Sequence, residues 1–151
     1  MQIVAADSSH LSILIPLFDA YRVFYRQQPN PDAVRNFLQQ RLNNQESIIF
    51  IAMDETNAAA MGFTQLYPCF SSTDMQRIYI LNDLYVTPEH RKQNVARELM
   101  RTAKEFALKN NAAELVLSTE ITNTAAQKLY VSEGYQKNER FFEYSLKLDH
   151  S

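Results

Sequence analysis

The sequence predicts a mixed α/β domain with a central, mostly antiparallel sheet of six to seven strands and about four helices. Two observations predict this class. Short segments rich in β-branched and aromatic residues alternate with segments whose apolar residues recur at helical spacing. The antiparallel strands come first and a β-α-β unit follows. No linker, repeat or low-complexity tract interrupts the chain, so we expect one domain over residues 1–151.

The first half of the chain contains four predicted strands and two predicted helices. Ser8 and Ser9 are N-cap residue types before a helix that extends to about Tyr25, and a second helix is expected to start at Pro31. The four strands share a high content of β-branched and aromatic residues, and they are 3–5, 47–53, 58–70 and 76–86.

The second half begins with an amphipathic helix from about Val95 to Lys109. A helix with Asn123 as its N-cap and Gly134 as its C′ residue is also expected. Three further strands complete the prediction, at 113–118, 135–138 and 140–148.

Composition excludes several classes of protein. The two glycines, Gly62 and Gly134, are too few for a Walker A loop or a G-x-G-x-x-G turn. A single cysteine, Cys69, excludes a disulfide framework, and the three histidines have no metal-ligand spacing, so no metal is expected. The net charge of −2 gives no overall attraction to nucleic acid or to an acidic membrane.

The apolar runs are too short to span a bilayer, and the first residues lack the pattern of a signal peptide. We therefore expect a cytoplasmic protein with neither a membrane nor a nucleic-acid partner.

A candidate anion site lies where the strand 76–86 breaks and the helix near Val95 begins. The first backbone N–H groups of a helix have no partner within it, and roughly +0.5 of a charge from the helix dipole lies there. Arg91 and Lys92 add side-chain cations, and Arg97 follows on the helix. The residues alone are compatible with a pyrophosphate site or with a solvated basic turn.

The same stretch resembles motif A of the GNAT acetyltransferases, in which a strand ending L-Y-V-x-P is followed by R-G-x-G-x-G/A and a helix. The matching residues run from Asp83 to Arg91 and from Val95 to Met100. The resemblance implies a GNAT-type three-layer fold and acetyl-CoA as co-substrate. It also implies that acetyl-CoA contacts the strand end and the turn, at Leu84, Tyr85, Val86, Arg91, Lys92, Gln93, Asn94, Val95, Ala96 and Arg97.

Lys92 and Asn94 stand where this family usually has glycine. One interpretation is that position 94 needs a left-handed backbone, which Asn tolerates at a cost on the order of 1 kcal/mol. The other is that glycine permits close approach of the phosphate, and the Asn side chain must then point away.

A second segment, from Asn123 to Tyr135, resembles the N-x-x-A-x-x-L-Y-x-x-x-G-F/Y segment of the same superfamily. The resemblance implies that Asn123 and Ala126 contact the cofactor arm and that Tyr130 gives a proton to the departing CoA thiolate. The alternatives are a helix cap for Asn123 and a core aromatic for Tyr130.

Acetylation of an amine needs a neutral nitrogen, and a carboxylate can bind the ammonium group and take its proton. The candidates are Asp83 at the strand end and Glu120 in the loop before Asn123. For Asp83, the alternative is a strand-end acid satisfied by backbone. The stretch 79–86 is similar to the diamine acetyltransferases, although Asn82 stands where they usually have Glu.

These observations predict an N-acetyltransferase that acts on a primary amine of a small molecule, such as a polyamine or another amino compound. Acetylation of a protein or peptide, and a non-catalytic module that binds acetyl-CoA, are the alternatives. The family resemblance also implies a homodimer.

Overall fold

The structure is a computed structural model that describes residues 1–150. The chain divides into two compact units, residues 1–118 and a second unit that begins at Thr119. The first unit contains the sheet and the first three α-helices, and the second contains the fourth α-helix. The expectation of a single domain over residues 1–151 stays a prediction.

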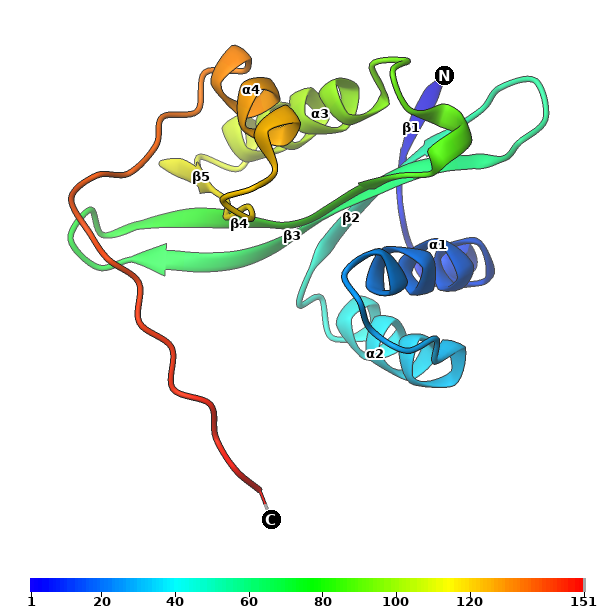
Figure 1. Ribbon diagram of the computed structural model, residues 1–151, viewed down its shortest axis with the longest axis horizontal. Coiled ribbons are helices and arrows are strands. Elements are labelled where there is room, and N and C mark those ends of the chain that lie inside the picture. The colour runs from blue at the N-terminus through cyan, green and yellow to red at the C-terminus, as the bar shows by residue number, and fades with distance from the viewer. Residues whose placement is uncertain (151) are drawn as a thin grey trace. The chain divides into compact units, whose positions relative to one another are not determined.

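The sheet of the first unit has five strands in the order β1-β2-β3-β4-β5 (Figure 1). Every neighbouring pair is antiparallel except β4 and β5, which are parallel. The strands are β1 (Gln2–Ala5), β2 (Ile48–Met53), β3 (Ala60–Ser71), β4 (Gln76–Val86) and β5 (Glu114–Val116). The mixed, mostly antiparallel sheet is confirmed, while the predicted count of six to seven strands is too high.

Helices cover both faces of this sheet, which makes three layers (Figure 1). Two helices pack on one face and one packs on the other. Their bounds are α1 (Leu11–Phe24), α2 (Pro31–Asn43) and α3 (Val95–Lys109), with short 3₁₀ helices η1 (Ser8–His10) and η2 (Pro88–His90). The second unit contributes α4 (Thr124–Ser132).

The cap before the first helix differs from the prediction. Asp7, rather than Ser8 or Ser9, is the N-cap of η1, and its side chain accepts a hydrogen bond of 2.8 Å from the Ser9 N–H. The N-cap residue of α1 itself is His10, whose side chain makes no capping bond. Asp is an equally good cap one residue earlier, and the turn it starts is η1, which leads into α1.

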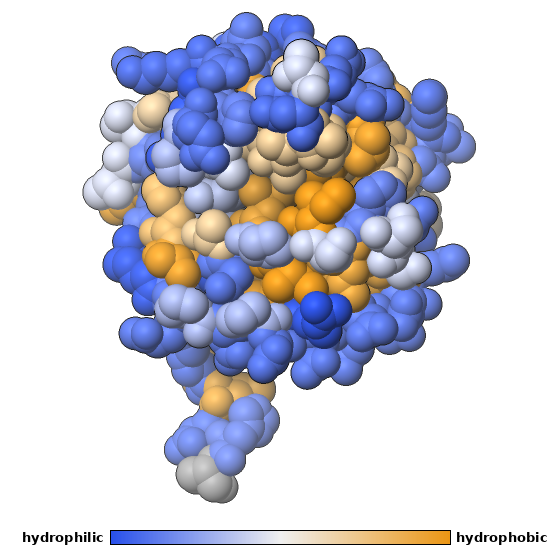
Figure 2. All heavy atoms as spheres, turned by 90° about the vertical axis from the view of Figure 1, so that its right-hand side faces the viewer, coloured by the Kyte–Doolittle hydropathy of each residue, from blue (hydrophilic) through white to orange (hydrophobic). Residues whose placement is uncertain are grey.

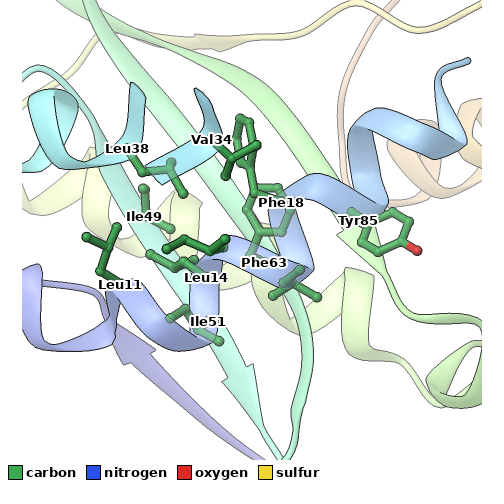
Figure 3. Packing of buried hydrophobic residues seen from close by; sticks show 11 residues of the cluster. Leu11, Leu14, Phe18, Val34, Leu38, Ile49, Ile51, Phe63 and Tyr85 are labelled. Carbon is green, nitrogen blue, oxygen red and sulfur yellow. The ribbon is translucent and has the colours of Figure 1, made fainter. Parts of the chain in front are cut away.

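The core lies between α1, α2 and the sheet (Figure 3). Leu14 on α1, Leu38 on α2 and Ile51 on β2 are fully buried there. Phe63 on β3 is also fully buried and packs against the ring of Phe18 at 5.5 Å. The apolar face of each helix and the alternation along the strands therefore meet in one cluster.

The two strands predicted at 135–138 and 140–148 are wrong, because the structure describes no strand after β5 up to residue 150. The second of these segments alternates apolar and polar residues, yet Phe142, Tyr144 and Leu146 are each more than four-fifths exposed. Alternation favours a strand only when a neighbouring strand supplies hydrogen bonds and a surface to cover, and no strand in the described residues pairs with this segment.

We expect Gly62→Ala to destabilise the fold by roughly 1–3 kcal/mol. Gly62 pairs with Val86 in the β3–β4 ladder, and a Cβ atom at Gly62 would lie 2.5 Å from the Tyr85 carbonyl oxygen. Urea unfolding measures the loss. The matched control is Gly134→Ala. A Cβ atom added at Gly134 would have no atom within 4 Å, so only the φ of +94° disfavours a side chain there. Equal stability of Gly62→Ala and the wild type would contradict this account.

Candidate functional site

The site is built on the end of β4, where the strand separates from β5. The parallel pairing joins only Ile78, Tyr79 and Ile80 of β4 to β5. From Leu81 to Val86, β4 pairs with β3 alone. The strand end therefore has one edge open to a ligand before the chain turns through η2 into α3.

The turn into α3 has a left-handed backbone at both positions where the GNAT motif usually has glycine. Lys92 has φ of 61° and Asn94 has φ of 64°, both in the left-handed region. Asn94 is the N-cap of α3, but its side chain makes no capping hydrogen bond. The left-handed interpretation of position 94 is thus confirmed. The Asn94 side chain therefore does not occupy the N-terminus of α3, and the helix dipole favours an anion there.

Asn94→Val is expected to destabilise the protein by roughly 1–2 kcal/mol, while Asn94→Gly should change stability by about 0.5 kcal/mol or less. A β-branched residue is strained at positive φ, and glycine is not. Thermal unfolding of both variants measures the difference. If the valine variant matched the glycine variant, the left-handed backbone would not limit the choice of residue at this position.

Arg91 is held at the strand end by two kinds of contact. Its Nε donates a hydrogen bond of 3.0 Å to the Val86 carbonyl. Its guanidinium lies over the rings of Phe24 and Tyr85, at 5.3 and 5.8 Å from their centres. A carbonyl oxygen has two lone pairs, so the Val86 oxygen can still accept a second donor.

An apolar hollow of about 660 Å³ lies beside these residues in the first unit. Viewed from the right-hand side of Figure 1, apolar atoms gather at the centre of the face and hydrophilic side chains surround them (Figure 2). The lining combines α1, the α1–α2 connection and the end of β4, and includes Val23, Phe24, Pro29, Tyr85 and Pro88. The charged lining residues are Asp19 and Arg91.

A bulge in β4 re-aims the residues that precede the open strand end. Gln65 of β3 pairs with Asp83, but Leu66 pairs with Leu81, so Asn82 is the extra residue of β4. Bulges bend a strand and often lie beside active sites. Asn82 is exposed, whereas Asp83 is 4% exposed.

The Asp83 carboxylate accepts hydrogen bonds from side chains. Gln65 Nε2 donates to Oδ2 at 2.6 Å, and Asn82 Nδ2 donates to Oδ1 at 3.1 Å. Gln65 Nε2 also donates to the Tyr67 hydroxyl at 3.1 Å. The alternative of a strand-end acid satisfied by backbone is therefore not what the structure shows.

Two tyrosines beside this carboxylate are hard to ionise. Burial raises the pKa of Tyr21 far above its ordinary value, and the charge and hydrogen bonding of Asp83 raise it further. Burial, followed by the charge of Asp83, raises the pKa of Tyr67 to about 12. Both hydroxyls stay protonated at neutral pH and present neutral, polar groups around Asp83.

The second unit carries the other predicted site residues on and before α4. Asn123 is the N-cap of α4, and its Oδ1 accepts a hydrogen bond of 3.1 Å from the Ala126 N–H. Its capping role is therefore confirmed, and its Nδ2 donors are the groups suited to a cofactor arm. Tyr130 lies on α4 with its ring 6.2 Å from that of Tyr135, and Glu120 is exposed before the helix.

Sequence reasoning missed Gln65. It expected the acceptor side on the first two helices and their connection, which contribute to the lining of the hollow, but it did not rank the residues there. Gln65 lies 18 positions before Asp83 and looks like an isolated polar residue in an apolar strand. That isolation was a signal, because a polar side chain in a buried strand needs a partner. Only the strand register identifies the partner.

Two searches of the described residues concern metal ligands and membrane-spanning helices. Over residues 1–150, no group of three or more His, Cys, Asp or Glu residues could hold a metal ion. No helix among these residues is both long and apolar enough to cross a membrane.

The chain is similar to known proteins in sequence and in fold. The family model described as Acetyltransferase (GNAT) family matches residues 14–135. The chain is 45% identical over 146 residues to the uncharacterized N-acetyltransferase YhfO of Bacillus subtilis (strain 168), and the match covers 97% of each chain.

Two solved structures resemble the fold. A probable acetyltransferase has a TM-score of 0.94 and 41% identity, with all of both chains covered. The aminoglycoside N-acetyltransferase AAC(6')-Iy, solved in complex with CoA, has a TM-score of 0.79 and 22% identity, covering 97% of this chain and 95% of its own. This second likeness concerns the fold alone.

Proposed function

Because the chain belongs to the acetyltransferase (GNAT) family, we propose that it moves an acetyl group from acetyl-CoA to a primary amine of a small molecule. The protein is an enzyme of the GNAT acetyltransferase type. The observation that carries the proposal is the open end of β4, followed by a left-handed turn and the N-terminus of α3. This arrangement fits an extended ligand that ends in an anionic group.

For the cofactor side, backbone groups of the open strand end, Leu84 to Val86, would bind the pantetheine arm of acetyl-CoA. The N–H groups from Lys92 to Arg97, with the helix dipole, would bind its pyrophosphate. Both left-handed residues of the turn, Lys92 and Asn94, support this assignment, because they let the backbone turn as the family's glycines do. The assignment of Asn123 and Ala126 to the cofactor arm stays a prediction.

For the chemistry, the amine nitrogen attacks the thioester carbonyl, a C–N bond forms and the C–S bond breaks. A lysine-like amine has a pKa near 10.4, so its deprotonation at neutral pH costs about 4.6 kcal/mol. Asp83 or Glu120 would take the proton, directly or through water. Tyr130 would return a proton to the CoA thiolate, since a tyrosine with a pKa of about 10 stays protonated at neutral pH.

The apolar hollow beside Tyr85 would hold the body of the acceptor. Its lining supports an amine that carries an aliphatic or aromatic part. Asp19 is the acidic residue of the lining, and its Oδ1 already accepts the Asn30 N–H at 2.9 Å and lies 3.5 Å from Arg22 Nη1. A polyamine and a more apolar amino compound are therefore distinct classes for an acceptor panel.

Two measurements test the proposal. Titration with acetyl-CoA in a calorimeter should show binding, and the absence of both heat and a thermal shift would overturn it. A panel of polyamines, aliphatic and aromatic monoamines, aminoglycosides and lysine peptides, assayed by thiol release, then measures turnover. Turnover of the peptides alone would identify a protein N-acetyltransferase. Binding of acetyl-CoA without any turnover would identify a non-catalytic module.

A cytoplasmic homodimer remains part of the proposal. The exposed apolar side chains of the second unit, including Phe142 and Tyr144, support self-association, because large exposed apolar surface favours an interface. Light scattering of the purified protein measures its mass, and a mass of one chain at micromolar concentration would reject the dimer.

A further inference from the structure

Gln65 is a buried amide whose position is explained by Asp83. It is fully buried on β3, directly opposite Asp83 in the β3–β4 ladder. Its Nε2 donates to the Asp83 carboxylate at 2.6 Å and to the Tyr67 hydroxyl at 3.1 Å. Both N–H donors of the Gln65 amide are therefore used, one by Asp83 and one by Tyr67.

In this orientation the oxygen of the same amide is left without a hydrogen bond. Within residues 1–150, Gln65 Oε1 is buried and has no hydrogen-bond partner. A buried acceptor without a donor destabilises the folded protein. The amide is thus oriented for the carboxylate and against its own hydrogen-bonding needs, which is typical of functional sites and not of a core built for stability alone.

Asp83 is surrounded by neutral groups and has no cation. Besides the amides of Gln65 and Asn82, the Tyr21 hydroxyl on α1 hydrogen-bonds with its carboxylate, and the Tyr67 hydroxyl lies near it. No lysine, arginine or histidine nitrogen among the described residues forms an ion pair with it. A buried carboxylate is stabilised in its charged form by hydrogen-bond donors when no opposite charge is near. The short bond from Gln65 is the strongest candidate for that role, since charge-assisted bonds are short.

We propose that Gln65 is a positioning residue for proton removal from the acceptor amine, because its Nε2 fixes the direction of the Asp83 carboxylate. This inference rests on the proposed function, in which Asp83 takes the proton. Gln65 does not touch the reacting atoms and acts only through Asp83. The competing explanation is a purely structural bond between β3 and β4.

The test compares Gln65→Met with Thr64→Val. Methionine keeps the size of the side chain and removes the donors. Thr64 is the adjacent residue of β3, is equally buried, and donates at 2.8 Å to the backbone carbonyl of Asp83 instead of its carboxylate. Both variants lose one buried hydrogen bond to the same residue, so a structural role predicts similar effects from both.

With acetyl-CoA and the best amine of the panel, Gln65→Met should lower kcat about tenfold or more at neutral pH. The KM for the amine should change much less than kcat, because Gln65 does not touch the amine. Thr64→Val should keep the wild-type kcat and KM. An unchanged kcat in Gln65→Met, with only a loss of thermal stability, would overturn the inference.

Two further measurements keep the outcome decisive. If Gln65→Met does not fold, Gln65→Glu keeps the length of the side chain, removes the amide donors and should lower kcat in the same way. The NMR signal of the Asp83 carboxyl carbon at one pH reports the loss of the donor without turnover, and an unmoved signal in the variant rejects the role of Gln65. Failure of the proposed function is distinct, since the wild type would then lack acetyl-CoA binding or turnover.

Discussion

Replacement of Asp83 by Asn is expected to lower kcat by roughly 10²–10⁴-fold at neutral pH, because it removes the proposed proton acceptor. Asp83 is buried and held by two side-chain amides, so its carboxylate has a defined direction. The decrease of the rate at acidic pH should be absent in this variant, because the proposed proton acceptor is gone. Steady-state thiol release across pH measures both effects.

Glu120→Gln is the matched comparison for Asp83→Asn, since Glu120 is the rival candidate and is exposed. If Glu120 is the base, Glu120→Gln should show the large decrease in kcat, and Asp83→Asn should keep most of the activity. Asp83→Asn also leaves the Gln65 amide facing another amide, which should cost about 1–3 kcal/mol of stability. Calorimetric binding of acetyl-CoA and urea unfolding separate this cost from a catalytic loss.

Tyr130→Phe is expected to lower kcat by about 10²-fold and to leave the KM for acetyl-CoA nearly unchanged. The hydroxyl is proposed to protonate the leaving thiolate, which is a contribution made in the transition state and not in binding. Thiol release with saturating amine gives kcat, and the loss should shrink for a thioester whose thiol is more acidic.

The control for Tyr130 is its neighbour in the second unit, Tyr135. The Tyr135 hydroxyl is buried without a hydrogen-bond partner in residues 1–150, and burial raises its pKa to about 12. Tyr135→Phe removes that unsatisfied group, so we expect unchanged kcat and a stability equal to or slightly above the wild type. Full activity in Tyr130→Phe would reject its role as the acid.

Most of the secondary structure could be predicted from local pattern. The strand 76–86 and the helix that begins at Val95 have the predicted bounds, because turn residues and a change of apolar period mark them. The cap at Asn123 and the stop at Gly134 follow from side-chain and backbone chemistry within a few residues. The same reasoning failed at 140–148, where pairing with another strand decides the outcome.

The strand, turn and helix N-terminus at the start of the site could also be predicted from the sequence, because each depends on neighbours along the chain. The open edge of the strand depends on where β5 pairs with β4, and only the structure shows it. Sequence also identified Asn94 as a residue that tolerates the left-handed backbone, and the structure places it there.

Only the tertiary structure decided which residues surround Asp83. The bulge at Asn82 shifts the β3–β4 register by one residue and brings Gln65 opposite Asp83. The hollow joins α1 to the end of β4. Such contacts depend on strand register and helix packing between segments distant in sequence, which local propensity does not encode, so the acceptor side is a property of the fold.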